Sequence, residues 1–210
     1  MVVVLNVFNF RTIFKLYLFL LMTSNSLIGQ HRIPNSITKE VRLALSYYPQ
    51  LVNTPIAFVF KKKIKKSTML AQPDFKSVFN PRKKRKYRIL ISENINIAGQ
   101  DFKTVDIPEN VLIGWIGHEL GHVMDYQNRS SLNLLWFGIK YAFSDSYLKE
   151  AERAADTYAV KNGMEKYILD TKHFILDNAD IDENYKTRIR KYYLSPEEII
   201  VLVNERDLNK

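Results

Sequence analysis

Two histidines four residues apart are the first feature of the chain that can do chemistry. They are His118 and His122, two of only four His in the sequence, and Glu119 follows the first of them in the order His-Glu-Leu-Gly-His. Residues four apart share one face of a helix, so both imidazoles can bind one metal ion. Glu119 is turned by about 100° and can act on a water molecule instead of on the metal. The spacing predicts a metal-binding helix with a carboxylate base, the pattern of zinc hydrolases.

Two imidazoles do not complete such a site. A catalytic zinc site has three protein ligands and an open position, and the chain contains no cysteine, so only His and carboxylates can serve. Asp125 lies on the same helix face, but seven residues of helix span about 10.5 Å. With zinc bonds of about 2 Å, Asp125 is poorly placed to share an ion with His118. We therefore expect Asp125 to make a polar contact at the end of the helix.

A second helical stretch, residues 149–159, offers an acidic pair with helical spacing. Glu152 and Asp156 are four residues apart and share a face. The alanines of this stretch (Ala154, Ala155 and Ala159) would let it approach the first helix closely. We expect Glu152 to be the third ligand and Asp156 to orient a ligand imidazole through a hydrogen bond. The alternative is a solvated acidic face.

The two motifs together carry a family resemblance. His-Glu-Leu-Gly-His followed by Glu152-Arg153-Ala154-Ala155-Asp156 resembles the gluzincin metallopeptidases, and is most similar to the HtpX-like and CAAX-prenyl-endopeptidase group. The resemblance spans residues 108–163 and implies zinc on His118, His122 and Glu152. It also implies that Glu119 is the base and that Asp156 supports a ligand. The chain departs from that group in lacking its multiple transmembrane helices.

The function predicted by this pattern is a zinc-dependent peptidase. Metal-activated water would attack a peptide bond of a peptide or protein substrate while Glu119 carries the proton. A donor for the oxyanion is also needed, and His173, Tyr158 and Tyr126 are candidates. By analogy the substrate would lie along an edge strand, for which residues 87–92 are the best choice. The alternative is a catalytically weak, zinc-holding binding protein of the cell envelope on the same scaffold.

The elements that must position these residues are strands followed by helices. Asp106 and Glu109 form a capping signature for the metal-binding helix, and Ser195 to Glu198 form another for a closing helix. Residues 132–143 are expected to be a core helix, or a flap facing substrate or membrane. Apolar spacing predicts further helices over 37–48 and 164–176, strands over 55–60 and 87–92, and weaker strands over 68–71 and 76–79. The fold class is therefore α+β and zincin-like: a small antiparallel or mixed sheet, then the active-site helix and a mainly helical C-terminal half.

Residues 1–29 have the composition of a targeting segment. Arg11 and Lys15 precede the apolar run 16–22, and small and polar residues follow up to Gly29. This is the order of a secretory signal peptide, and the run is shorter than the roughly 20 residues of a transmembrane helix. We expect a secreted or periplasmic protein whose metallopeptidase domain is residues 30–210. An uncleaved N-terminal membrane anchor is the alternative.

Positive charge is concentrated in two runs, residues 61–66 and 82–86, within a chain of net charge +9. One interpretation is solvated turns whose charge discourages aggregation. The other is contact with an anionic membrane or envelope surface. Neither run is interleaved with aromatic residues or matches a nucleic-acid motif, so nucleic acid is not expected as a partner. An apolar content of 46% excludes wholesale disorder.

Overall fold

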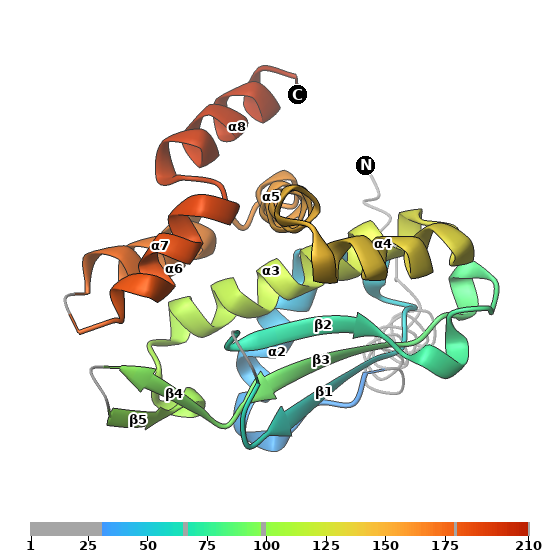
Figure 1. Cartoon of the computed structure of the whole chain (residues 1–210), viewed down its shortest axis with the longest axis horizontal. Helices are drawn as coiled ribbons and strands as arrows, with labels where there is room; N and C mark the ends of the chain where they lie inside the picture. The colour runs from blue at the N-terminus through green and yellow to red at the C-terminus, as the bar shows by residue number, and fades with distance from the viewer. Residues whose placement is uncertain (1–30, 65–66, 98–99, 179, 210) are drawn as a thin grey trace, which may run out of the picture.

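The computed structural model describes residues 31–64, 67–97, 100–178 and 180–209, so the expected signal peptide or anchor lies outside the described residues. The described chain is α+β, with a small sheet on one side and a predominantly helical C-terminal half on the other (Figure 1). Across these residues, no helix is both long and apolar enough to cross a lipid bilayer.

A three-stranded mixed sheet forms the N-terminal half. The strand order is β1 (Ile56–Lys61), β3 (Tyr87–Ser92), β2 (Met69–Pro73), and β3 runs parallel to β1 and antiparallel to β2. The strand predicted over 87–92 is confirmed, but its predicted place at an edge of the sheet is wrong. β3 is the central strand, because β1 pairs with one of its sides and β2 with the other. The edge strand nearest the helices is β2.

A second, two-stranded sheet and several 3-10 turns connect this sheet to the helices. β4 (Asn94–Ile97) and β5 (Gln100–Lys103) form an antiparallel pair that we did not predict. The weak strand expected over 76–79 is wrong: η3 (Phe75–Ser77) begins there, because the Asp74 side chain accepts a hydrogen bond from the Lys76 N–H. The other turns are η1 (Asn35–Ile37), η2 (Pro49–Leu51), η4 (Arg82–Lys84) and η5 (Thr104–Asp106).

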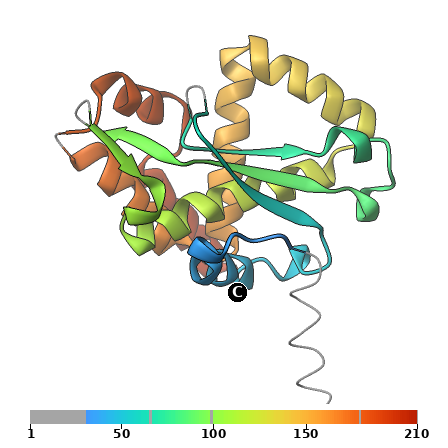
Figure 2. The ribbon, with the colours of Figure 1, turned by 90° about the horizontal axis from the view of Figure 1, so that it is seen from below.

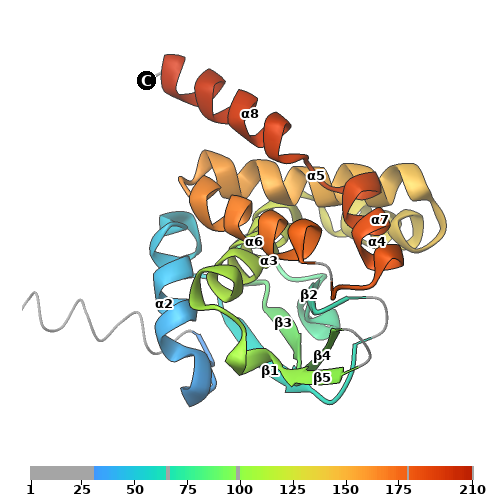
Figure 3. The same ribbon diagram turned by 90° about the vertical axis from the view of Figure 1, so that its left-hand side faces the viewer.

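The long helix α3 (Glu109–Asn128) is the centre of the fold. It lies between the sheet and the helices α5 (Asp145–Lys161) and α6 (Glu165–Asp177), and is buried around most of its circumference (Figures 1 and 3). Such all-round burial is typical of a core helix. The cap predicted from Asp106 is wrong, because Asp106 ends η5 and the helix starts three residues later, behind Pro108. The remaining helices are α2 (Thr38–Ser46), α4 (Ser131–Phe143), α7 (Glu183–Tyr192) and α8 (Pro196–Leu208).

The ends of α5 and α8 follow their sequence signals. α5 ends at Lys161 with Asn162 as its C-cap, and Gly163 adopts a φ of +86°, a left-handed conformation that glycine accepts without steric cost. α8 starts with the predicted capping box: Ser195 Oγ accepts from the Glu198 N–H, and the Glu198 carboxylate accepts from the Ser195 N–H. These turns set the direction in which α6 and α8 pack against α5.

Candidate metal centre

The residues predicted as metal ligands converge on one point. Nε2 of His118 lies 3.0 Å, and Nε2 of His122 3.3 Å, from the same oxygen of Glu152, Oε2. All three side chains are buried, and their ligand atoms lie within 4.8 Å of one another. Ligand atoms placed tetrahedrally about 2 Å from a zinc ion are about 3.3 Å apart. The three residues therefore form a buried group that could hold a metal ion.

Close contact between α3 and α5 brings the three ligands together. A Cβ atom added to Gly121 would lie 2.3 Å from the carbonyl oxygen of Ala155, so a side chain there would push the helices apart. The buried face of α5 carries Ala151, Ala155 and Ala159, whereas Ala154, which we expected at this contact, is only partly buried. Glycine in the second variable position of the motif thus permits Glu152 to reach the two histidines.

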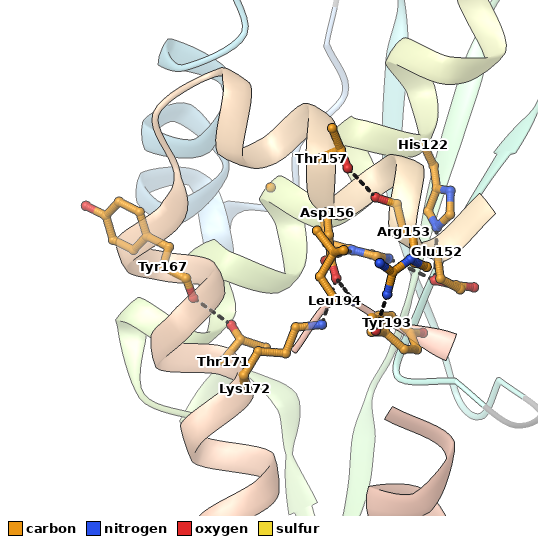
Figure 4. Close-up of polar contacts among 12 residues, drawn as sticks. His122, Glu152, Arg153, Asp156, Thr157, Tyr167, Thr171, Lys172, Tyr193 and Leu194 are labelled. Carbon is orange, nitrogen blue, oxygen red and sulfur yellow. Dashed lines mark hydrogen bonds and ion pairs between the residues drawn. The ribbon is translucent and has the colours of Figure 1, made fainter. Parts of the chain in front are cut away.

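Asp156 lies against His118, where it can orient the ring. Its Oδ1 is 2.8 Å from Nδ1 of His118. Its Oδ2 accepts from Lys172 Nζ at 2.8 Å and from the Leu194 N–H at 3.1 Å, and Figure 4 shows Asp156 with Lys172 and Leu194. An imidazole that donates from Nδ1 to a carboxylate presents the lone pair of Nε2 on its other side. Asp156 therefore points Nε2 of His118 toward Glu152.

Lys172 is part of the centre although we did not predict it. Its side chain is almost fully buried, with a relative exposure of 3% for the residue. The sequence contains a signal for this position: Lys172 falls on the apolar face of α6 with Ile168 and Ile175. A charge on such a face needs a buried partner, and Asp156 is that partner.

Glu119 is turned toward the sheet. Its Oε2 accepts a 2.5 Å hydrogen bond from the N–H of Ala71 in the edge strand β2, and its side chain is buried. Burial raises the pKa of the Glu119 carboxyl, and the nearby His122 and His118 offset part of this effect. A raised pKa brings the carboxyl closer to neutral pH, where a general base works best.

Charges inside the cluster compensate one another. Burial alone would lower the pKa of His118, but the carboxylates of Asp156 and Glu152 raise it to about 10. Burial opposes ionisation of Glu152, yet His122 and His118 hold its pKa well below the ordinary value. Burial also opposes ionisation of Asp156, but Lys172 and His118 lower its pKa to about 2. The metal-free cluster thus keeps a proton on His118 between two carboxylates, a position that a cation can take over.

Aromatic side chains line the cluster. The Tyr141 hydroxyl donates to Oε1 of Glu152 at 2.7 Å. The ring centroid of Tyr193 lies 5.3 Å from that of His118, and the Tyr126 ring stacks on His122 at 5.9 Å. Neither Tyr141 nor Tyr193 was predicted, because each reaches the cluster only through packing of its own segment. Three tyrosines therefore lie next to metal-ligand candidates.

Two of the predicted oxyanion donors are engaged elsewhere. His173 pairs with Asp177 at 2.9 Å, and both side chains are largely exposed. The Tyr158 hydroxyl accepts a hydrogen bond from Asn128 at 2.8 Å. Neither prediction is supported by these contacts. The third candidate, Tyr126, is beside the cluster, and its hydroxyl donates to the carbonyl of Ala71 at 3.3 Å.

The rival ligand Asp125 makes the polar contact expected for it. Its two carboxylate oxygens lie 2.8 and 3.2 Å from guanidinium nitrogens of Arg129, one turn further along the chain. The ion pair is at the end of α3, beyond the ligand residues. Asp125 thus stabilises the end of the helix.

One small cavity adjoins the cluster, and a larger groove borders that cavity. A small one of about 40 Å³ is lined by His118 and Glu119 among others. A single water needs about 10–15 Å³, so a water molecule fits beside the Glu119 carboxylate. Ser67, Thr68 and Tyr185 also line this cavity, and the same three residues line a larger groove of about 740 Å³. The groove thus borders the small cavity beside His118 and Glu119.

The groove carries more positive than negative charge. It lies between the end of β1, the β4 strand and α7, and its charged lining residues are Lys62, Lys63, Arg188, Lys191, Asp101 and Asp182. Asp101 accepts a hydrogen bond from Asn96, and Asp182 caps α7 by accepting from the Tyr185 N–H. Among the cations, Lys191 forms an ion pair with Asp145, which does not line the groove. An acidic ligand would therefore meet cations along this groove.

Comparisons with known proteins identified no similar family, protein or structure. A scan against models of protein families, a search of curated proteins and a search of solved structures each gave no match.

Proposed function

We propose that the chain is a zinc-dependent peptidase of the gluzincin type with a zincin-like domain. The observation that carries the proposal is the convergence of His118, His122 and Glu152 on one point, while Glu119 is turned to an edge strand. Mixed imidazole and carboxylate donors suit zinc, and the Nε2 atoms of His118 and His122 lie 3.0 and 3.3 Å from Oε2 of Glu152. When bound, zinc would lower the pKa of a coordinated water to about 7 and polarise a carbonyl.

The chain's own residues would take the following parts in hydrolysis. Glu119 accepts a proton from the attacking water and returns it to the leaving nitrogen. Asp156 holds His118 in the orientation that the metal requires. We assign the stabilisation of a developing oxyanion to Tyr141, whose hydroxyl donates to Oε1 of Glu152, and to Tyr193, whose ring lies beside that of His118. They replace His173 and Tyr158 in this role.

The edge of β2 offers a place for the substrate backbone. The N–H and C=O of Ala71 bond to the side chains of Glu119 and Tyr126, so these backbone groups face the site and not β3. An extended peptide could pair with this edge by exchanging those bonds. From there it would continue into the cationic groove, which favours acidic residues in the substrate.

Metal analysis and proteolysis test the proposal together. The purified chain should contain one zinc ion and cleave an unstructured protein such as casein. His122→Ala and Glu152→Gln should lose the metal. Glu119→Gln should keep the metal and lose activity by about 100- to 10,000-fold. Two exposed residues provide matched controls, His173→Ala and Glu150→Gln, and neither should change zinc content or rate.

Each failure has its own meaning. A wild-type chain without zinc would overturn the proposed site. A chain that holds zinc but cleaves no peptide under any condition favours the alternative, a zinc-holding binding protein of the cell envelope. Loss of zinc in the His173→Ala control would show that the metal is bound elsewhere.

Substrate preference tests the groove separately. Peptides with acidic residues on one side of the cleaved bond should be preferred over otherwise identical peptides with glutamine. Arg188→Gln should reduce that preference, because the guanidinium lines the groove. Arg190→Gln, which removes an exposed cation paired with Glu183 on the same helix, should leave it unchanged.

A further inference from the structure

Helix α4 is apolar on two opposite faces. At 100° per residue, Leu134, Phe137 and Tyr141 fall within one arc of about 60°. Leu134 and Phe137 are buried, and Tyr141 reaches Glu152, so this face packs onto the domain. The prediction of a core helix over 132–143 is therefore only half right.

The outer face of α4 is an exposed apolar stripe. Its residues follow the spacing four, three, four and lie within a second arc of about 60°. Their exposed fractions are 77% for Leu132, 57% for Trp136, 53% for Ile139 and 88% for Phe143. The fold gives this stripe no partner among the described residues, and contiguous exposed apolar surface usually marks a binding site. The stripe is about 16 Å long, so it can lie along a bilayer but not cross one.

A basic cluster is fixed next to the start of this stripe. Arg85 donates to the hydroxyl of Ser131 at 3.0 Å, and that hydroxyl donates to the carbonyl of Val78 at 2.8 Å. These bonds hold the connection between β2 and β3 against the first turn of α4, at the right of Figure 2. Its exposed cations are Lys76, Arg82, Lys83, Lys84 and Lys86, and none forms an ion pair with an acidic residue in the described part of the chain. The same connection exposes Phe75 by 71% and Phe79 by 65%.

We propose that this surface, the outer stripe of α4 together with the basic connection 75–86, binds the headgroup region of an anionic lipid membrane. Tryptophan and phenylalanine insert at the boundary between headgroups and acyl chains, while lysine and arginine attract anionic lipid. Charge argues against a second copy as the occupant. Neither 75–86 nor 131–143 contains an acidic residue, so the same surface of a second copy would offer no countercharge in a symmetric contact. The inference is independent of the proposed peptidase function.

Trp136 gives a local readout of membrane binding in the full chain. The only other tryptophan, Trp115, is already buried at 9% exposure. Indole emission moves to shorter wavelength in less polar surroundings, so a lipid-induced shift reports on α4. We expect this shift with vesicles of equal parts phosphatidylcholine and phosphatidylglycerol, and little with phosphatidylcholine alone. Salt should weaken it, since screening reduces attraction between charges.

Variants separate charge from apolar contact. Lys83→Gln with Lys84→Gln should raise the lipid concentration at half-maximal shift by roughly 25-fold, about fivefold for each charge. Ile139→Ser with Phe143→Ser should also weaken binding. The matched control is Ile200→Ser with Val201→Ser, which changes two comparably exposed residues on α8 and should have no effect. Because residues 1–30 stay the same in every variant, their contribution cancels in these comparisons.

Three outcomes would overturn the proposal. They are no emission shift on anionic vesicles, an equal shift on neutral vesicles, and a shift without lipid that grows with protein concentration. The last result would assign the stripe to contact between copies of the chain.

Discussion

Nδ1 of His118 lies 2.8 Å from Oδ1 of Asp156, and this contact determines which ring nitrogen faces Glu152. The carboxylate is itself held by Lys172 from α6. One ligand orientation thus depends on three helices, since α3 carries the ring, α5 the carboxylate and α6 the cation. A ring flip would break a buried hydrogen bond to a charged group, which costs about 1.5–3 kcal/mol.

Asp156→Asn should weaken zinc binding. The amide keeps the shape of the side chain but removes the charge that makes the His118 imidazole a better ligand, and such changes cost about 10- to 100-fold in metal affinity. Competition with a chromophoric chelator measures the effect. Asp170→Asn, which alters a surface ion pair with Lys166, is the control and should leave the affinity unchanged. A zinc affinity of Asp156→Asn equal to that of the wild type would show that Asp156 does not support the metal ligands.

The proton on His118 predicts how metal binding depends on pH. The metal must displace this proton, because the pKa of His118 is raised to about 10 in the metal-free cluster, from 6.5. Between these values the apparent zinc affinity should rise about tenfold per pH unit, with release of one proton. Calorimetry in buffers of different ionisation enthalpy measures the release.

The same pKa predicts that the stability of the metal-free protein, prepared with a chelator, falls as pH rises, whereas the zinc affinity increases. A group whose pKa is raised on folding stabilises the folded state fully below its unfolded value. That contribution disappears as pH rises toward the folded value. The melting temperature of the metal-free chain should therefore fall from pH 7 to pH 9.5. A melting temperature that stays constant or rises over this range would contradict a protonated His118.

Gly121→Ala should separate the two ligand helices. The new methyl group would lie 2.3 Å from the Ala155 carbonyl oxygen, and overpacking of this kind costs about 1–3 kcal/mol. Because α5 carries Glu152, zinc stoichiometry should fall together with the free energy of unfolding. Gly138→Ala is the control: its Cβ meets nothing within 4 Å, so helix propensity should stabilise α4 by about 0.5–1 kcal/mol. Full zinc content in Gly121→Ala would show that the helix spacing is adjustable.

Arg85→Met should destabilise the fold without touching the metal ligands. Its guanidinium is buried and donates to the carbonyls of Tyr126 and Arg129 at the end of α3, and to Ser131. Losing hydrogen bonds from a charged donor costs about 1.5–3 kcal/mol, measurable by urea denaturation. Lys84→Met removes an exposed cation of the same run and should change stability by less than about 0.5 kcal/mol. A similar loss of unfolding free energy in both variants would show that the buried hydrogen bonds of Arg85 do not stabilise the fold.

The ligand residues were predictable because their signals are local. His118 and His122 are fixed relative to each other by one turn of helix, and so are Glu152 and Asp156. The strand over 87–92 follows from a short apolar run, and the cap at Ser195 from four residues. None of these predictions needs knowledge of how the elements pack.

The rest of the site depends on packing between distant segments. Tyr141 and Lys172 reach the cluster from α4 and α6, and Tyr193 from the segment after α7. The exposed apolar face of α4 was not predicted, because the number of apolar residues in 132–143 does not show which of them are buried and which are exposed. The strand β4 does have a local signal, since Asn94-Ile95-Asn96-Ile97 alternates polar and apolar residues. The predicted edge position of residues 87–92 was wrong because the order of strands in a sheet depends on how all the strands pair, which the sequence of one strand does not determine.

Strand order also constrains how the chain folds. The two outer strands, β1 and β2, come first in sequence and do not pair with each other; the central strand β3 comes last. During synthesis both outer strands must wait with unpaired edges until residues 87–92 emerge. Unpaired edges invite association between chains, and charged residues flanking such strands act as gatekeepers against it. The lysines after β1 and the basic run before β3 stand at those positions, so the charge that surrounds the sheet also protects the chain before the sheet exists.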